Sequence, residues 1–214
     1  MSWLPICNSV MFPTMLVSLI FWNLGGMLLS IGLLIFSSYF LIKEVYKTSR
    51  HYMAGFWLFI LSEVAIFLSL FLTCLWSKEW GSACISDSTE LPFLGCFFLL
   101  GSSLTATAYH HKFGSILALP LLGFTMFLGF CFVLLQLFEF YDCFCDLLYS
   151  TYYAVSFCMV GLHFSHVLIG IVGLLILFFL GGSLTKLYYV NLGVWYWHFV
   201  DYIWLLVFII VYLC

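Results

Sequence analysis

The sequence has very few charged residues. Lysine, arginine, aspartate and glutamate together make up 7% of the 214 residues, and 65% of the residues are hydrophobic. A soluble domain carries about 25% charged residues, because its surface has to face water. The composition therefore excludes a soluble globular domain and predicts a protein that lies in a lipid bilayer. It also leaves no basic patch that could bind nucleic acid.

Several motifs that carry catalytic chemistry are also absent. The chain has no GxSxG motif, no P-loop and no HExxH motif, and its nine cysteines include no CxxC pair. The cysteines are scattered among apolar residues, so we interpret them as small buried hydrophobic residues, with a disulfide or a metal site as the alternative. The residues alone predict no nucleophile paired with a base.

The hydrophobic residues form long continuous runs. Such runs predict helices rather than a membrane barrel, because no alternation of period two is present. One helical span needs about 20 apolar residues. We therefore expect an all-α integral membrane protein, with one transmembrane domain over residues 1–214 and a bundle of about six helices. The expected spans are 14–42, 53–77, 92–110, 114–137, 151–180 and 192–213.

The basic residues are unevenly distributed between the expected loops. With six spans, Lys78 falls on one side of the membrane and the other five basic residues fall on the opposite side. These five are Lys43, Lys47, Arg50, Lys112 and Lys186. Inner loops carry an excess of lysine and arginine, so we expect the second side to be the inner one and both termini to be outside. The acidic segment from Glu139 to Asp146 is then an outer loop that we expect to be solvated.

One carboxylate lies deep in an expected span. Glu63 is about ten residues into the second span, which at about 1.5 Å per residue places it roughly 15 Å deep, near the bilayer midplane. A lone carboxylate at that depth should be protonated or hydrogen-bonded. A proton-accepting or gating site and a structural bond to a neighbouring helix both explain such a residue.

Three histidines and an aspartate also lie within expected spans. His163 and His166 share a face of the fifth span, as do His198 and Asp201 in the sixth, because residues three apart on a helix are neighbours. A metal site and haem ligation are two interpretations, but no complete ligand set converges with these residues in the sequence. We expect instead an interhelical polar cluster that binds no metal.

Basic residues and aromatic residues follow the first span on its inner side. Lys43, Lys47, Arg50 and His51 precede Trp57. This composition suits the headgroups of anionic lipids, and an ordinary positive-inside anchor has the same composition. We expect ordered phospholipid at these residues.

Several segments match, in the same order, motifs of one known family. Trp195–Trp204 reads WYWHFVDYIW and is similar to the family's WYWHFVDVVW, and Leu58–Val64 (LFILSEV) is similar to LFIISEV, which carries the family's buried glutamate at the position of Glu63. The other matches are Lys43–Lys47 with RDVIRE, Glu90–His111 with an EVP-to-AHH helix, Leu134–Asp142 with LLQASEYYE, and Gly161–Gly170 with GFHGLHV and IIG. From about residue 40 to its end, the chain resembles subunit III of the haem–copper respiratory oxidases of the cytochrome c oxidase type.

The resemblance implies a fold and a set of partners. The family usually has seven helices, and we expect this chain to lack the first. Subunit III binds no haem and no copper; haem a and copper lie in partner subunits. It packs directly on the catalytic subunit I, with subunit II and supernumerary subunits as further partners, and it holds structural phospholipid such as cardiolipin.

The same resemblance implies a function and a location. The chain would be an accessory, non-redox subunit that stabilises subunit I, supports proton uptake during oxygen reduction and is not catalytic on its own. Glu63 would then have a structural or lipid-linked role. The expected location is the mitochondrial inner membrane, with both termini on the intermembrane-space side; a bacterial plasma membrane is the alternative.

Two other functions stay open. Subunit III of a quinol oxidase has a similar fold and differs in an electron donor that this subunit does not contact. An ion-coupled transporter could use Glu63, His198 and Asp201, but transporters more often show broken helices and inverted repeats, and neither is evident here.

Overall fold

The computed structural model describes residues 4–47, 53–78, 90–143, 150–184 and 187–213. Within these ranges the protein contains seven α-helices, and a short π-helical segment follows the last of them. The chain forms two compact units, Met1–Met53 and Ala54–Cys214. Six of the described helices are long and apolar enough to cross a membrane, and α1 is a shorter apolar helix.

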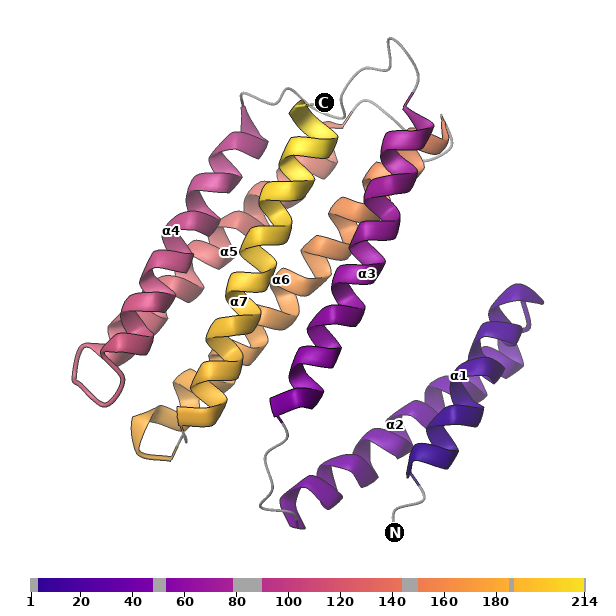
Figure 1. The fold of residues 1–214 in the computed structure, drawn as a ribbon, viewed down its shortest axis with the longest axis horizontal. Coiled ribbons are helices and arrows are strands. Elements are labelled where there is room, and N and C mark those ends of the chain that lie inside the picture. The colour runs from indigo at the N-terminus through magenta and orange to yellow at the C-terminus, as the bar shows by residue number, and fades with distance from the viewer. Residues whose placement is uncertain (1–3, 48–52, 79–89, 144–149, 185–186, 214) are drawn as a thin grey trace. The chain divides into compact units, whose positions relative to one another are not determined.

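The first unit is a hairpin of the helices α1 (Leu4–Ile20) and α2 (Leu24–Lys47) (Figure 1). In the turn between them, Trp22 has a φ of 51°, in the left-handed region that residues other than glycine seldom adopt. Asn23 then begins α2, because its side-chain oxygen accepts a hydrogen bond from the backbone N–H of Gly26 at 3.3 Å. This is the bond by which an asparagine caps a helix.

The hairpin shows that the expected first span is wrong as a single helix. The sequence predicted one helix over 14–42, but the chain reverses direction at residues 21–23. Ser37 of α2 donates a hydrogen bond to the side-chain oxygen of Asn8 in α1 at 2.5 Å, so the two helices run antiparallel side by side. Two helices therefore precede α3, where the sequence predicted one.

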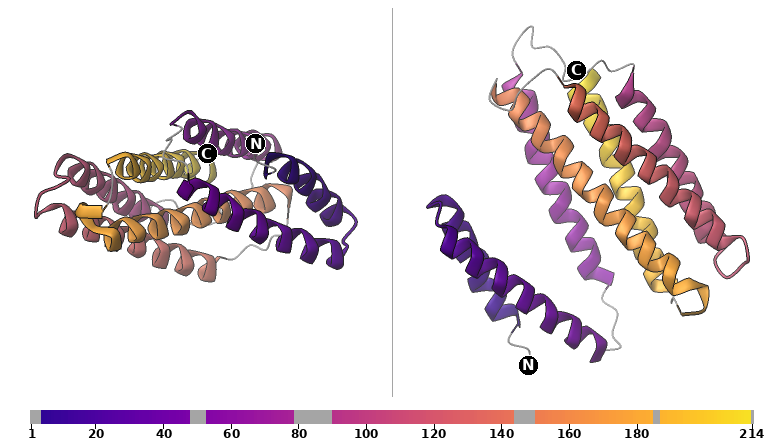
Figure 2. Two further views of the ribbon diagram at one scale, coloured as in Figure 1. Left: turned by 90° about the horizontal axis from the view of Figure 1, so that it is seen from below. Right: turned by 180° about the vertical axis from the view of Figure 1, so that it is seen from behind.

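The second unit is a bundle of five helices (Figures 1 and 2). In this unit α4, α5, α6 and α7 form a closed ring in which each helix packs against two others, and α3 contacts α6 and α7 through side chains. The bounds are α3 (Met53–Ser77), α4 (Leu91–His111), α5 (Ala118–Asp142), α6 (Thr151–Leu184) and α7 (Leu187–Val207), and the π-helical segment is Phe208–Leu213.

Proline and glycine mark several helix ends in this bundle. Pro92 lies in the first turn of α4 and Pro120 in the first turn of α5, where the missing N–H leaves no helical bond unmade. Gly114, with a φ of 86°, lies in the turns between these helices, which explains why α5 begins at residue 118 rather than at the expected 114. Gly181, with a φ of 63°, interrupts the regular geometry of α6 near its end.

The centre of the bundle is the fully buried side chain of Trp197 on α7. Its indole N–H donates a hydrogen bond to the hydroxyl of Ser102 on α4 at 2.9 Å. Its ring lies against Gly129 of α5 and Gly170 of α6, where an added Cβ would come within 2.7 Å and 3.0 Å of the indole. One aromatic side chain therefore contacts the other three helices of the ring, and two glycines make the space for it.

Candidate functional site

The buried carboxylate of α3 and a histidine of α6 form a pair. His166 Nε2 lies 3.0 Å from Glu63 Oε2, and the other ring nitrogen, Nδ1, lies 2.8 Å from the carbonyl oxygen of Leu162. A carbonyl only accepts, so Nδ1 carries a proton. The contact with Glu63 then needs one further proton, either on Nε2 or on the carboxyl group. The pair is neutral as a whole in both arrangements.

Aromatic rings surround this pair. The rings of Phe67, Tyr196 and Phe199 have their centroids 5.5 Å, 6.5 Å and 6.4 Å from that of His166. The side chains of His166 and Glu63 are 9% and 18% exposed on this chain. An apolar surrounding strengthens a hydrogen bond and makes an unpaired group costly. The pair therefore connects α3 to α6 at the depth where the sequence placed Glu63.

His163 lies one turn away on α6 and contacts a different helix. Its Nε2 lies 3.1 Å from the backbone oxygen of Val200 on α7. Its ring packs against Trp204 and Phe132, with centroids 5.0 Å and 5.7 Å away. The side chain is fully buried, and its Nδ1 has no partner among the described residues. This histidine joins α6 to α7.

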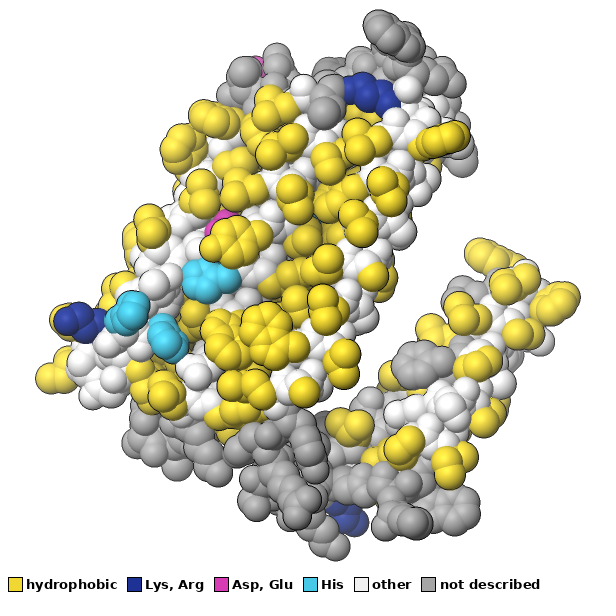
Figure 3. Space-filling model, viewed as in Figure 1, with side chains coloured by type: hydrophobic (Ala, Val, Ile, Leu, Met, Phe, Trp, Pro, Cys, Tyr) yellow, Lys and Arg dark blue, Asp and Glu magenta, His cyan; other side chains and the backbone are white. Residues whose placement is uncertain are grey.

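His198 on α7 contacts α4. Its Nδ1 lies 2.7 Å from the hydroxyl of Ser103, and its Nε2 lies 3.3 Å from the hydroxyl of Thr107. Thr107 already donates to the carbonyl oxygen of Ser103, so His198 donates to Thr107 and accepts from the hydroxyl of Ser103. Closer to the C-terminal end of α4, His110 Nε2 lies 2.7 Å from Asn191 Oδ1. Figure 3 shows histidine side chains gathered over α4 and α7.

Asp201 is almost fully buried, and neither of its carboxylate oxygens makes a hydrogen bond within 3.5 Å among the described residues, although the side chain of Ser103 on α4 is close enough to interact with it. The structure thus does not bring His163, His166, His198 and Asp201 into one cluster. Residues three apart on a helix differ by about 60° around its axis, which is enough to face different neighbours in a packed bundle. Within the described ranges, no three His, Cys, Asp or Glu side chains lie together as a group that could hold a metal ion.

Only part of the expected lipid site is described. Lys43 is exposed on α2, and Trp57 is half exposed on α3, where its ring lies 5.3 Å from that of Trp195. The side chain of Lys47 lies outside the described residues, as do Arg50 and His51 entirely. Lys43 and Trp57 belong to different units of the chain.

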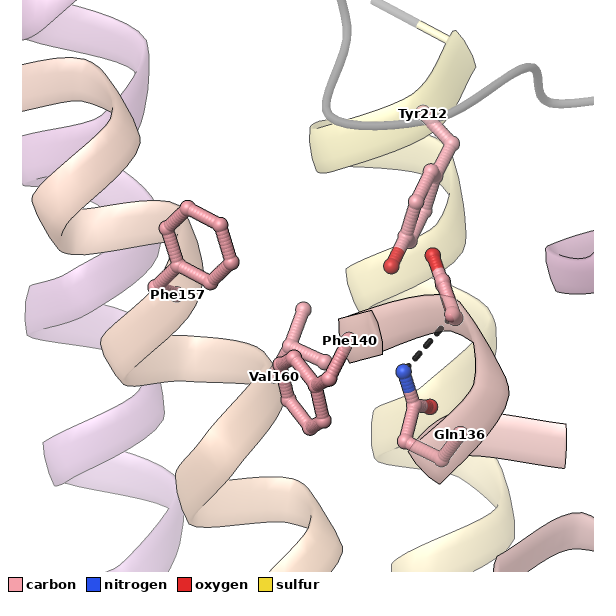
Figure 4. A pocket seen from close by; sticks show the side chains of 6 residues that line it. Gln136, Phe140, Phe157, Val160 and Tyr212 are labelled. Atoms are coloured by element: carbon pink, nitrogen blue, oxygen red, sulfur yellow. Dashed lines mark hydrogen bonds between the residues drawn. The ribbon is translucent and has the colours of Figure 1, made fainter. Parts of the chain in front are cut away.

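The structure shows one buried polar pair that sequence reasoning missed. Gln136 donates a hydrogen bond to Glu139 at 2.6 Å, and both side chains are nearly fully buried near the end of α5. They line a small pocket with Phe157, Val160 and Tyr212, and with Phe140 (Figure 4). The expectation of a solvated Glu139 is therefore wrong, because α5 continues to Asp142. The available signal was the spacing of Gln136 and Glu139, which puts both on one helical face.

The sequence matches a family and several curated relatives. The family model described as cytochrome c oxidase subunit III matches residues 7–214. Cytochrome c oxidase subunit 3 of Pisaster ochraceus is 32% identical over 182 residues, covering 74% of this chain and 68% of the relative. The protein of the same name from Drosophila melanogaster is 34% identical over 176 residues, covering 74% and 67%.

A bacterial relative covers the same share of this chain. Cytochrome c oxidase subunit 3 of Bacillus sp. (strain PS3) is 32% identical over 176 residues, covering 74% of this chain and 84% of the relative. The family match begins within α1 and includes every helix of both units. The chain is a multi-pass membrane protein and belongs to the cytochrome c oxidase subunit III family.

Proposed function

We propose that the chain is the accessory, non-redox subunit of a cytochrome c oxidase. It packs on the catalytic subunit I, stabilises that subunit, and supports proton uptake while oxygen is reduced; haem a and copper lie in partner subunits. The observation that carries this proposal is the family match from residue 7 to residue 214, which includes every helix that the structure describes.

The described polar contacts support a structural role. Glu63 is bonded to His166, His163 to the backbone of Val200, and His198 to two hydroxyl groups of α4. Each of these bonds connects two helices. A transporter would need such groups to be free to bind an ion. Glu63 and His198, two of the three residues that a transporter could use, are engaged in these contacts, which favours the accessory subunit over a transporter.

The proposed function is tested by purifying the complex through an affinity tag on this chain. An absorption spectrum with haem a bands in stoichiometric amount supports the proposal, and a haem-free, monodisperse protein refutes it. Oxygen consumption with reduced cytochrome c and with a quinol, measured on the same preparation, then separates a cytochrome c oxidase from a quinol oxidase.

A Glu63→Gln variant is expected to assemble and to consume oxygen at close to the normal initial rate. Glutamine removes the shared proton, but its amide can still donate a hydrogen bond to Nε2 of His166. Any defect should appear as lower stability or as weaker lipid retention. A tenfold lower initial rate in an assembled complex with normal haem spectra corresponds to about 1.4 kcal/mol of barrier, and would show that Glu63 takes part in turnover.

We propose that phospholipid such as cardiolipin binds at the basic residues between Lys43 and His51. Lys43, Lys47 and Arg50 supply the positive charge, and His51 and Trp57 follow them in the sequence as further expected lipid contacts. A basic side chain near an anionic headgroup contributes about 1 kcal/mol. Mass spectrometry of lipid extracted from the purified complex should therefore show less cardiolipin after Lys43, Lys47 and Arg50 are replaced by alanine. Unchanged cardiolipin would contradict the proposed site.

We propose that the protein lies in the mitochondrial inner membrane, with the end of α7 on the intermembrane-space side; a bacterial plasma membrane is the alternative. The hairpin changes the side of the membrane on which we expect the first helix to begin. Because α1 is antiparallel to α2, and α2 leads to the basic segment around Arg50, the start of α1 should lie on the inner side.

An epitope placed before Leu4 tests this topology. It should resist protease added to the outer face and be cleaved once the inner face is opened, whereas an epitope placed after residue 214 should be cleaved from the outer face. Cleavage of both epitopes from the outer face would contradict this topology and would agree with the prediction from six spans that both termini are outside.

A further inference from the structure

The exposed surface of the bundle differs in polarity from one helix to another. In their middle turns, the exposed side chains of α5 and α6 are apolar, as at Phe127, Phe130, Ile169 and Val172. Such surfaces suit contact with lipid chains, which offer no hydrogen bonds. The face formed by α4 and α7 is different, because polar side chains lie among its hydrophobic ones (Figure 3).

Tyr202 is the most exposed polar side chain on the α7 part of this face. It is 62% exposed, and it lies about 15 residues into α7 and about 11 residues before the end of the π-helical segment. At about 1.5 Å per residue these distances are roughly 22 Å and 16 Å. The phenol is therefore near the middle of the membrane, too deep for its hydroxyl to reach water at either surface.

The surrounding residues do not provide a hydrogen bond for this hydroxyl. The ring of Tyr202 stacks on that of His198, with the centroids 6.4 Å apart, but both nitrogens of His198 are bonded to hydroxyls of α4. Among the described residues, none accepts a hydrogen bond from Tyr202. Tyrosine hydroxyls that lack water normally find a partner, and lipid chains cannot supply one.

The hydroxyl of Tyr202 also has an energetic cost on a lipid-facing surface. A polar group in an apolar surrounding costs free energy unless it is hydrogen-bonded. In membranes, helices associate through packing and hydrogen bonds between their side chains, because the bilayer itself provides no hydrophobic driving force. Tyr202 thus suits a protein neighbour better than lipid.

We propose that a transmembrane helix of another oxidase subunit covers the α4–α7 face and presents a hydrogen-bond acceptor to Tyr202. The inference rests on the proposed function and adds to it the face of the chain that meets the partner. The neighbour lies across Thr107, His198 and Tyr202, where the stacked imidazole and phenol form a polar strip between apolar side chains. The acceptor is a backbone carbonyl, a hydroxyl or a carboxyl group of that helix.

Photo-crosslinking in the assembled oxidase tests this contact. A benzophenone amino acid replaces Tyr202 in one sample and Phe127 in the other; both are large exposed aromatic residues, and Phe127 lies on the apolar face of α5. Irradiation should join position 202 to one partner subunit, identified by mass spectrometry, with a yield at least fivefold higher than at position 127. Lipid adducts alone at position 202, or equal protein yields at the two positions, would overturn the proposal.

The crosslinking experiment can contradict the proposed contact without contradicting the proposed function. If tagged chain carries haem a but position 202 reacts only with lipid, the oxidase assignment stands and the proposed contact fails. A Tyr202→Phe variant provides a second measurement, because it keeps the ring and removes the hydroxyl. The chain should then be released from the complex at a lower detergent concentration, and release at the unchanged concentration would refute a hydrogen bond at this position.

Discussion

Replacing Trp197 with alanine is expected to remove most of the assembled complex. The side chain is fully buried against Gly129 and Gly170 and bonded to Ser102. Truncating a buried tryptophan typically costs about 3–5 kcal/mol, and here it also leaves the hydroxyl of Ser102 without its donor. A domain with about 5–15 kcal/mol of stability loses a large fraction of it. The measurement is the amount of intact oxidase in membranes, by native electrophoresis and haem spectrum.

The matched control for this variant is Trp76→Ala. Trp76 is 92% exposed, so the same chemical change should leave the level of complex nearly unchanged. A Trp197→Phe variant keeps an aromatic ring and should give an intermediate loss. Equal levels of complex for Trp197→Ala and Trp76→Ala would show that the packing of four helices around one indole is not what stabilises the bundle.

A Glu139→Ala variant is expected to lower the free energy of unfolding by about 1–3 kcal/mol, because it leaves the buried amide of Gln136 without its acceptor. The effect should appear as a lower temperature at which the chain is lost from the purified complex. The loss should be local to the end of the bundle where the C-terminal turns of α5 meet the residues around Tyr212.

Asp142 provides the comparison for Glu139. It lies three residues further along α5 and is exposed, so Asp142→Ala should change the temperature of loss by little. Equal shifts for the two acids would mean that the charge at this end of the helix matters and that the buried hydrogen bond does not.

Hydropathy predicted the helices of the second unit, since α3 to α7 are continuous apolar runs separated by polar or glycine-containing segments. It could not predict the turn between α1 and α2, because Phe21 and Trp22 are as apolar as the helices they separate. The signal there was chemical: Asn23 is a residue that caps helices, and Gly25 and Gly26 follow it.

The sequence was enough to identify the polar residues of the candidate site, but it could not predict which residues they contact. Glu63 and His166 could each be identified as polar groups in a span, and their bond depends on how α3 packs against α6, which no local pattern contains. The same holds for Trp197, whose space comes from glycines 68 and 27 residues earlier in the chain, Gly129 and Gly170. Composition indicates which side chains are buried, whereas packing between distant segments determines which residues those side chains contact.

The proton shared by Glu63 and His166 leaves this buried pair without a net charge. Moving one elementary charge across a membrane changes its energy by about 2.3 kcal/mol per 100 mV, so a lone carboxylate at the midplane would feel roughly half of any potential. The pair has no net charge whichever partner holds the proton. The potential across an energised membrane therefore exerts no net force on this pair.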